Sequence, residues 1–225
     1  MIRFDIVTIF PGMFTGVLGD SIMKRAQASG KVVFRVHDLR DYTLDPHRKV
    51  DDRPFGGGPG MVMTAQPLVD AVKKIRGRRK VKVIAMAPAG KVFTQKKARE
   101  LAAEKNILLI CGHYEGMDER VCEMVVDESL SIGDYVLTGG EIPAMAVVDA
   151  VARLVPGVLG KEASLEDESF ENNLLEYPHY TRPADFCGKK VPAVLLSGNH
   201  QAVKMWRMAQ ALERTRKYRP DLIKE

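Results

Sequence analysis

The chain has 225 residues, of which 45% are hydrophobic and 28% charged, with a formal net charge of +5. This is the composition of an ordinary globular protein, long enough for one full core or for a larger domain and a small one. No segment approaches the ~20 apolar residues of a membrane span. The N-terminus lacks the apolar run and cleavage site of a signal peptide, so a first strand is expected there.

The cysteines indicate the redox compartment. Cys111, Cys122 and Cys187 are odd in number and form no Cys-x-x-Cys pair. Neither a disulfide framework nor a zinc cluster is indicated, and a reducing cytoplasm fits best.

Strand and helix patterns alternate along the first 160 residues. Thr94 is placed to cap a helix, Pro143 suits a first helical turn, and the apolar run 107–111 is typical of a strand buried on both faces. Strands are expected at 3–10, 32–38, 81–86 and 107–111, and helices near 13–28, 66–75, 94–104, 118–125 and 143–155. The alternation predicts an α/β fold with a mostly parallel sheet.

The pattern changes after Pro156-Gly157. Residues 160–172 are acidic and weak in apolar periodicity, as expected of a linker. The chain ends in a basic amphipathic helix from about Asn199 to Tyr218, with Met205, Met208, Ala209 and Leu212 along one face. We expect an α/β domain at 1–160, a linker at 161–172 and a C-terminal helical domain at 173–225.

Charge is unevenly distributed along the chain. Residues 189–225 hold nine Lys or Arg against three Asp or Glu, an excess of +6, and Lys73 to Lys82 is a second basic cluster. A basic end often signals a polyanionic partner, usually nucleic acid. Charge alone fits a solvated helix face about as well.

The segment 52–60 holds four glycines and two prolines. Phosphates often bind at glycine-rich loops, but a P-loop needs Lys and Ser or Thr after the last glycine, and here Met61-Val62-Met63 follows. The dinucleotide pattern Gly-x-Gly-x-x-Gly between a strand and a helix is also missing. Composition therefore indicates only a sharp turn or a close approach of a ligand.

Three glycine-bearing segments each follow a strand-like apolar run, namely 87–90, 111–116 and 131–141. In open parallel sheets, ligands bind beyond the carboxyl ends of strands. Glycines there expose backbone groups that can contact the edges of a nucleoside. The sequence therefore predicts a cofactor pocket without a phosphate anchor.

Other chemistries find little support. The five histidines show no metal-ligand spacing, so no metal site is predicted. No Gly-x-Ser-x-Gly elbow occurs, which argues against hydrolase chemistry.

Five long motifs carry a resemblance to a known family. They are Val50-Asp51-Asp52-Arg53-Pro54-Phe55-Gly56-Gly57-Gly58-Pro59-Gly60-Met61, Cys111-Gly112-His113-Tyr114-Glu115-Gly116-Met117-Asp118-Glu119-Arg120, Ser131-Ile132-Gly133-Asp134-Tyr135-Val136-Leu137 with Gly139-Gly140-Glu141, Pro178-His179-Tyr180-Thr181-Arg182-Pro183 and Leu196-Ser197-Gly198-Asn199-His200. In their order, and over nearly the whole chain, they resemble the bacterial tRNA (guanine-N1)-methyltransferases, which are SPOUT-type methyltransferases.

The resemblance implies a deep trefoil knot in the α/β domain, S-adenosylmethionine as methyl donor, and the guanosine immediately 3′ of the anticodon in tRNA as target. It also implies a homodimer whose active sites combine both subunits, and it places 52–60 on the tRNA side. The family's activity is associated with magnesium. The cofactor-binding residues that it and the three segments indicate are Pro88, Gly112, Tyr114, Glu115, Ile132, Gly133, Asp134, Tyr135, Val136, Leu137, Gly139 and Gly140.

The resemblance also indicates catalytic residues. Arg153 matches the family's catalytic arginine. The family's general base is an aspartate directly before Ser-Phe, and here Glu168 holds that position with Asp167 just before it. Glu168 is favoured because it occupies the aligned position. Asp167 has the residue type of the family but lies one position earlier.

Two other functions remain alternatives on sequence grounds. One is a nicotinamide-dependent oxidoreductase, which the missing phosphate fingerprint disfavours. The other is a non-catalytic RNA-binding protein that uses the basic C-terminal region.

Overall fold

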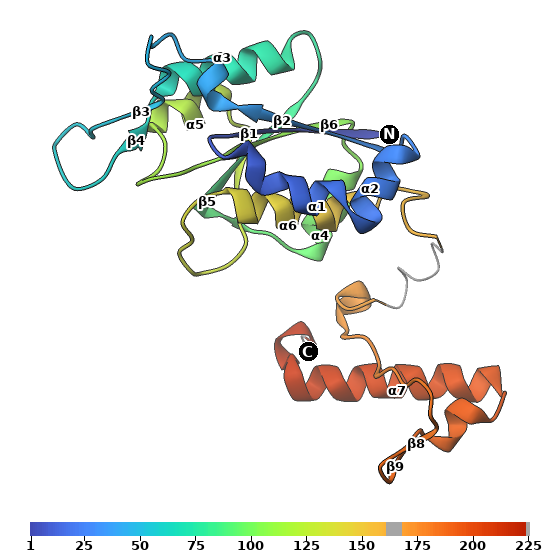
Figure 1. Ribbon diagram of the computed structural model, residues 1–225. Coiled ribbons are helices and arrows are strands. Elements are labelled where there is room, and N and C mark those ends of the chain that lie inside the picture. Colours follow the sequence, from blue (N-terminus) through green and yellow to red (C-terminus); the bar gives the residue numbers. More distant parts are fainter. Residues whose placement is uncertain (161–167, 224–225) are drawn as a thin grey trace. The chain divides into compact units, whose positions relative to one another are not determined.

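The computed structural model describes residues 1–160 and 168–223. The chain divides into two compact units, Met1–Gly160 and Lys161–Glu225 (Figure 1). The first unit is an α/β structure around a five-stranded parallel sheet in the order β2-β1-β6-β5-β7. The expected α/β class with a mostly parallel sheet is therefore confirmed.

The five strands of this sheet supply the centre of the core. They are β1 (Ile2–Thr8), β2 (Val32–Asp38), β5 (Lys82–Val92), β6 (Asn106–Cys111) and β7 (Glu128–Ser131). Side chains alternate between the two faces, so Phe4 and Ile6 join one apolar cluster while Val7 joins the other. The run Ile107–Cys111 is buried throughout, as expected for a strand covered on both sides.

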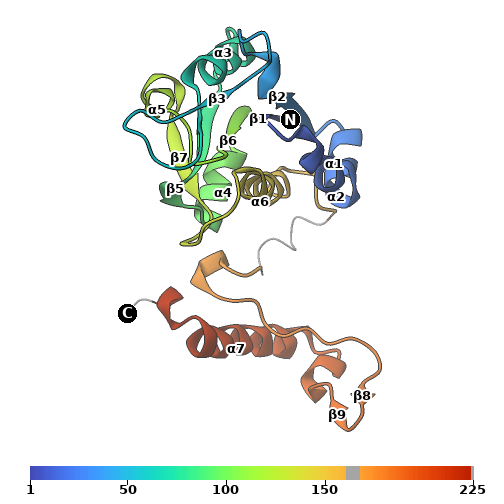
Figure 2. The ribbon, with the colours of Figure 1, turned by 60° about the vertical axis from the view of Figure 1, so that its left-hand side comes forward.

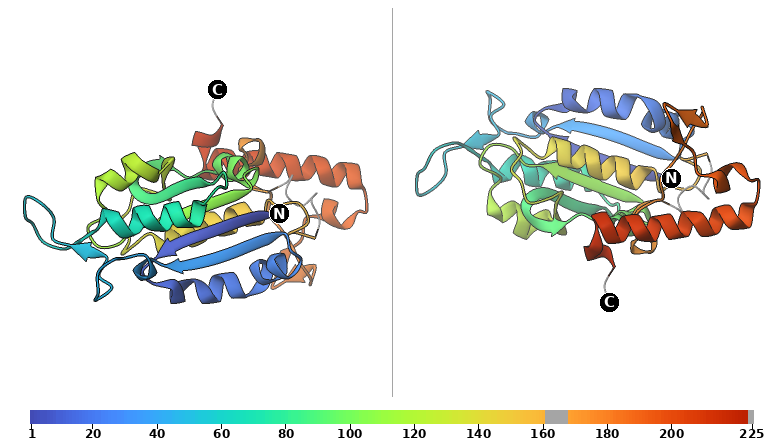
Figure 3. Two further views of the ribbon diagram at one scale, coloured as in Figure 1. Left: turned by 90° about the horizontal axis from the view of Figure 1, so that it is seen from above. Right: turned by 90° about the horizontal axis from the view of Figure 1, so that it is seen from below.

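Helices cover both faces of the sheet (Figures 2 and 3). One face carries α1 (Thr15–Gly19), α2 (Ser21–Ala28), α4 (Gln95–Ala102) and α6 (Glu141–Ala152), and the other carries α3 (Ala65–Arg76) and α5 (Glu119–Val125). The Thr94 side chain accepts a hydrogen bond from the Lys97 backbone, which confirms it as the cap of α4. The helix expected at 13–28 is interrupted at Asp20, whose extended backbone separates α1 from α2.

The strands on either side of the candidate site also differ from the sequence-based expectation. Residues 87–90 were expected to form a loop, but they lie inside β5, where Met86 and Lys91 both pair with Leu130 around an irregularity. Strand β7 does precede the segment 131–141, as expected, but it is the short sequence Glu-Ser-Leu-Ser and not an apolar run, so its bounds were not among the expected strands. The glycine-rich segment connects two further short strands, β3 (Asp51–Asp52) and β4 (Val62–Met63), and projects from the first unit (Figure 1).

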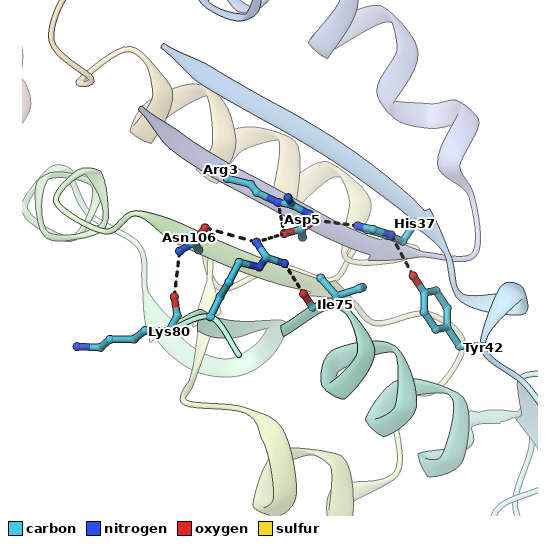
Figure 4. A network of polar contacts seen from close by, with 8 residues as sticks. Arg3, Asp5, His37, Tyr42, Ile75, Lys80 and Asn106 are labelled. Carbon is cyan, nitrogen blue, oxygen red and sulfur yellow. Dashed lines mark hydrogen bonds and ion pairs between the residues drawn. The ribbon is translucent and has the colours of Figure 1, made fainter. Parts of the chain in front are cut away.

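A polar network crosses the α3 face of the sheet (Figure 4). The fully buried Asp5 carboxylate accepts a hydrogen bond from Arg3 at 2.7 Å and lies 2.8 Å from Nε2 of His37, whose Nδ1 lies 3.0 Å from the Tyr42 hydroxyl. Arg79 reaches the same carboxylate at 3.5 Å. Burial alone would raise the pKa of Asp5, but the hydrogen bonds from His37 and Arg3, with their charges, lower that pKa to about 2.

The second unit is built on the long helix α7 (His200–Tyr218), which the Asn199 side chain caps. The other elements are β8 (Asp185–Phe186), β9 (Lys189–Lys190) and the short 3-10 helices Glu171–Asn173, Ala193–Leu196 and Pro220–Leu222. Thr215, buried on α7, accepts a hydrogen bond from the Leu175 backbone at 2.8 Å. The stripe that contains Met205 and Met208 is not the buried side of α7, because both methionines are exposed while Ala211 and Thr215 are buried.

The strand order does not determine how the chain threads, so the trefoil knot stays a prediction. Among the described residues, no helix is both long and apolar enough to cross a membrane.

Candidate active site

The loop after β6 and the start of α6 are in direct backbone contact. Gly140 N–H donates a hydrogen bond to the carbonyl oxygen of Gly112 at 2.7 Å. The backbones of His113 and Gly139 form an isolated antiparallel β-bridge. A Cβ added at Gly140 would lie 2.8 Å from both the Cys111 Cα and the Gly112 nitrogen. Only glycine therefore allows this approach, which brings together three of the residues expected to bind the cofactor.

The segment 131–137 follows β7 and forms a tight turn. The Ser131 hydroxyl donates to the carbonyl of Gly133 at 3.0 Å, and Tyr135 N–H donates to the same carbonyl at 3.0 Å. Gly133 has φ +151°, a conformation that favours glycine. Tyr135 and Val136 are 55% and 90% exposed, so the turn presents apolar surface that a ligand could cover.

Pro88 lies on the irregularity of β5, beside β7. It is exposed, and proline suits such a position because it has no N–H to donate to a ladder. Gly90 is required here, since an added Cβ would lie 2.5–2.6 Å from backbone carbons of Ser129 and Leu130. The three segments predicted to form the pocket thus lie along β6, β5 and β7, which are neighbours in the sheet.

The loop 113–118 also contacts the end of the glycine-rich segment. Glu115 N–H donates to the Met61 carbonyl at 3.0 Å, and Met63 N–H donates to the Gly116 carbonyl at 2.9 Å. A Cβ at Gly60 would overlap the Glu115 side chain. Two motifs that lie far apart in the sequence therefore share one surface.

Tyr114 extends this surface. Burial, followed by the nearby negative charge of Asp51, raises the pKa of the Tyr114 phenol. Its backbone φ of +59° is unusual for a residue with a side chain and turns the loop sharply after His113.

A buried acid that sequence reasoning did not assign stands at the first position of α6. Glu141 is 1% exposed, and its Oε1 accepts a hydrogen bond from the Thr8 hydroxyl at 2.8 Å. Its Oε2 lies 3.6 Å from Nδ1 of His113. The sequence signal was an acidic residue in the first turn of a helix, where the helix dipole favours it.

Arg153 caps the C-terminal end of α6, where its backbone N–H donates to the Asp149 carbonyl at 3.2 Å. Gly140 caps the other end of the same helix. Twelve helical residues separate the two caps, and such a helix is ~18 Å long.

Glu168 belongs to the second unit, where it lines a pocket together with residues of the segment 172–177 and of α7. The lining includes Tyr177, His200, Lys204 and Arg207. The Arg207 guanidinium lies 4.7 Å from the centre of the Tyr177 ring, in cation–π geometry. Asp167, the alternative base, lies outside the described residues.

The residues that the structure describes contain no group of three or more His, Cys, Asp or Glu side chains placed to hold a metal ion. The role of magnesium therefore remains a prediction from the resemblance.

Comparisons with known proteins bear on the whole chain. The model of the family described as tRNA (Guanine-1)-methyltransferase TrmD matches residues 2–225. A tRNA (guanine-N(1)-)-methyltransferase of Ruminiclostridium cellulolyticum is 56% identical over 223 residues, covering 98% of this chain and 96% of the relative. Proteins of the same name from Bacillus cereus and Bacillus anthracis are each 55% identical over 225 residues, covering 99% of this chain and 92% of each relative. With the family model matching almost every residue, the chain belongs to the tRNA (guanine-1)-methyltransferase family.

Proposed function

We propose that this protein transfers a methyl group from S-adenosylmethionine to N1 of the guanosine immediately 3′ of the anticodon in tRNA, in the cytoplasm. The observation that carries the proposal is the contact of Gly112 with Gly140, inside a chain that belongs to this family. This contact supports a backbone-lined site beyond the carboxyl end of β6, the kind of position at which α/β sheets bind ligands.

The chemistry of this site fits the cofactor. The turn 131–137 offers the exposed apolar side chains of Tyr135 and Leu137, while the backbone around Gly112 and Gly139 can hydrogen-bond to the edge of an adenine. We assign cofactor binding to these residues together with Pro88, Tyr114, Glu115, Ile132, Gly133, Asp134, Val136 and Gly140. When bound, S-adenosylmethionine supplies a methyl group activated by its sulfonium charge.

The chain's own residues must prepare the guanine. Guanine N1 carries a proton at neutral pH and becomes nucleophilic only when that proton leaves. A general base near N1 and a positive group near O6, where negative charge develops, meet this need. We assign Arg153 to the charge at O6 and Glu168 to proton removal, with Asp167 as the alternative base.

The length of α6 supports a homodimer with composite sites. Gly140 and Arg153 stand at opposite ends of this helix, ~18 Å apart. The Arg153 side chain therefore begins at the end of α6 that is far from Gly140. We therefore infer that the arginine at each site comes from a second copy of the chain, whose α6 ends where the first copy's loops begin.

The second unit carries the charge needed to hold tRNA. Lys189 and Lys190 are exposed on β9, and Arg207, Arg214 and Arg216 lie along α7. We assign these five side chains to contacts with tRNA phosphates, which position a substrate without reading its sequence.

A transfer assay with tritiated S-adenosylmethionine tests the function. Transcripts of tRNA that carry guanosine 3′ of the anticodon should accept label, and matched transcripts with adenosine there should not. Calorimetry with S-adenosylmethionine and with NADH separates this proposal from an oxidoreductase. Binding of tRNA without any transfer of label would instead indicate a non-catalytic RNA-binding protein.

A further inference from the structure

Three elements of the first unit meet at the His113 side chain. Its ring packs edge-on against Phe10, which follows β1, with ring centres 4.9 Å apart, and against Tyr114 of its own loop at 5.1 Å. On a third side it faces Glu141, the first residue of α6. His113 thus lies at the junction of the two glycine-bearing segments that meet at Gly112 and Gly140.

The contact between His113 and Glu141 is incomplete. Nδ1 of His113 is buried and makes no hydrogen bond with any described residue, although Oε2 of Glu141 lies only 3.6 Å away. A buried polar atom without a partner is costly, and closing the gap by about half an ångström would produce a normal hydrogen bond. The carboxylate itself is fixed, because its other oxygen accepts the bond from Thr8.

Gly139 lies directly against this pair. A Cβ at position 139 would overlap both the Glu141 carboxylate and Nδ1 of His113. The pair therefore packs closely against the backbone at Gly139, one of the candidate cofactor-binding residues.

We propose, on the basis of the function proposed above, that His113 and Glu141 are positioning residues whose contact closes when S-adenosylmethionine binds, and that closure is strongest when the imidazole is protonated. A cationic donor to a carboxylate makes a shorter and stronger hydrogen bond than a neutral one. Since the bound state contains the closed pair, it favours the protonated ring, and cofactor binding takes up protons.

Other charges around the ring set the background. Among the described residues, Arg40 lies over the Phe10 ring, and both Arg40 and Asp51 act electrostatically on Tyr114, so one positive and one negative group stand beside the two rings that pack against His113. Imidazole side chains commonly change charge between pH 5 and 8, a range that calorimetry covers.

The test is calorimetry of the full-length protein with S-adenosylmethionine, in buffers of different ionisation enthalpy, from pH 6 to 8.5. The wild type should take up a fraction of a proton, and its affinity should fall about three- to tenfold across this range. His113→Leu and Glu141→Gln should bind more weakly at pH 6 and lose most of the proton uptake. His113→Arg keeps a permanent positive charge and should bind with little dependence on pH.

His47→Leu is the matched control, because it makes the same substitution at an exposed histidine of the first unit. It should bind like the wild type at every pH. Equal proton uptake by the wild type and His113→Leu, or a wild-type affinity independent of pH, overturns the inference while the proposed function stands. No binding of S-adenosylmethionine by the wild type overturns the proposed function itself.

Discussion

The backbone N–H of Gly140 donates a 2.7 Å hydrogen bond to the carbonyl oxygen of Gly112. This bond joins the end of a central strand to the start of α6. It leaves no room for a side chain at position 140, because the atoms next to it are backbone atoms of Cys111 and Gly112. The close approach gives the candidate cofactor site its shape.

Substituting Gly140 by alanine tests this role. The backbone at Gly140 has φ −82°, which any residue adopts, so the effect of Gly140→Ala is steric alone. Overpacking against backbone atoms should weaken S-adenosylmethionine binding about tenfold or more, as measured by calorimetry. Gly16→Ala, where an added Cβ meets nothing within 4 Å, should leave the affinity unchanged. Wild-type affinity in Gly140→Ala would place the cofactor site elsewhere.

Mixed dimers test whether each active site combines two copies of the chain. A dimer of one Gly140→Ala chain and one Arg153→Ala chain contains one composite site in which both residues are intact. At an S-adenosylmethionine concentration well below the dissociation constant of the Gly140→Ala chain, methyl transfer should therefore return to about half of the wild-type rate, whereas each homodimer is strongly impaired. If both residues act within the same chain, both sites of the mixed dimer are defective and mixing restores nothing.

Sequence reasoning reached much of the fold because local signals and tertiary structure agree there. The apolar run 107–111 became a central strand, and Thr94 caps a helix as its hydroxyl predicts. The bounds of strand β7 escaped detection because Glu128 and Ser129 are polar, and its pairing with β5 determines its structure. Residues 87–90 resembled a turn because proline and glycine dominate them, yet a neighbouring strand holds them in the sheet.

In the candidate site, too, some residues could be predicted from local sequence and others are set by tertiary contacts. Its glycines stand out in the sequence because they recur in three segments, 87–90, 111–116 and 131–141. The buried hydrogen bond between Thr8 and Glu141 joins residues 133 positions apart, so no local sequence pattern predicts it. Likewise, the apolar stripe of Met205 and Met208 is helical in spacing, but the buried side of α7 is set by the segment around Leu175.

The Asp5 network predicts a pH dependence of stability. The pKa of Asp5 in the folded protein is about 2, below its ordinary value, so its contribution is complete above about pH 4 and is lost as the pH falls toward 2. Asp5→Asn should reduce the free energy of unfolding at pH 7 by about 2 kcal/mol, and this deficit should shrink between pH 4 and 2. Denaturant unfolding at several pH values measures it, with the exposed Asp70→Asn as control. A deficit that stays constant down to pH 2 would contradict the assignment.

The identity of the general base is tested by single-turnover methyl transfer with Glu168→Gln and Asp167→Asn. Loss of the base should slow the step by roughly 10²–10⁴ while cofactor affinity is preserved. We expect the large loss in Glu168→Gln. A near-normal rate there, combined with collapse in Asp167→Asn, would move the role to Asp167.

The most direct test of the proposed function is to locate the methyl group in the product. A tRNA transcript is incubated with the wild-type protein and S-adenosylmethionine, and the modified nucleoside is identified by mass spectrometry and mapped by primer extension. The account predicts 1-methylguanosine at the nucleotide immediately 3′ of the anticodon, and none when that nucleotide is adenosine. Methylation at another nucleotide or on another atom of guanine, or no methylation at all, would contradict it.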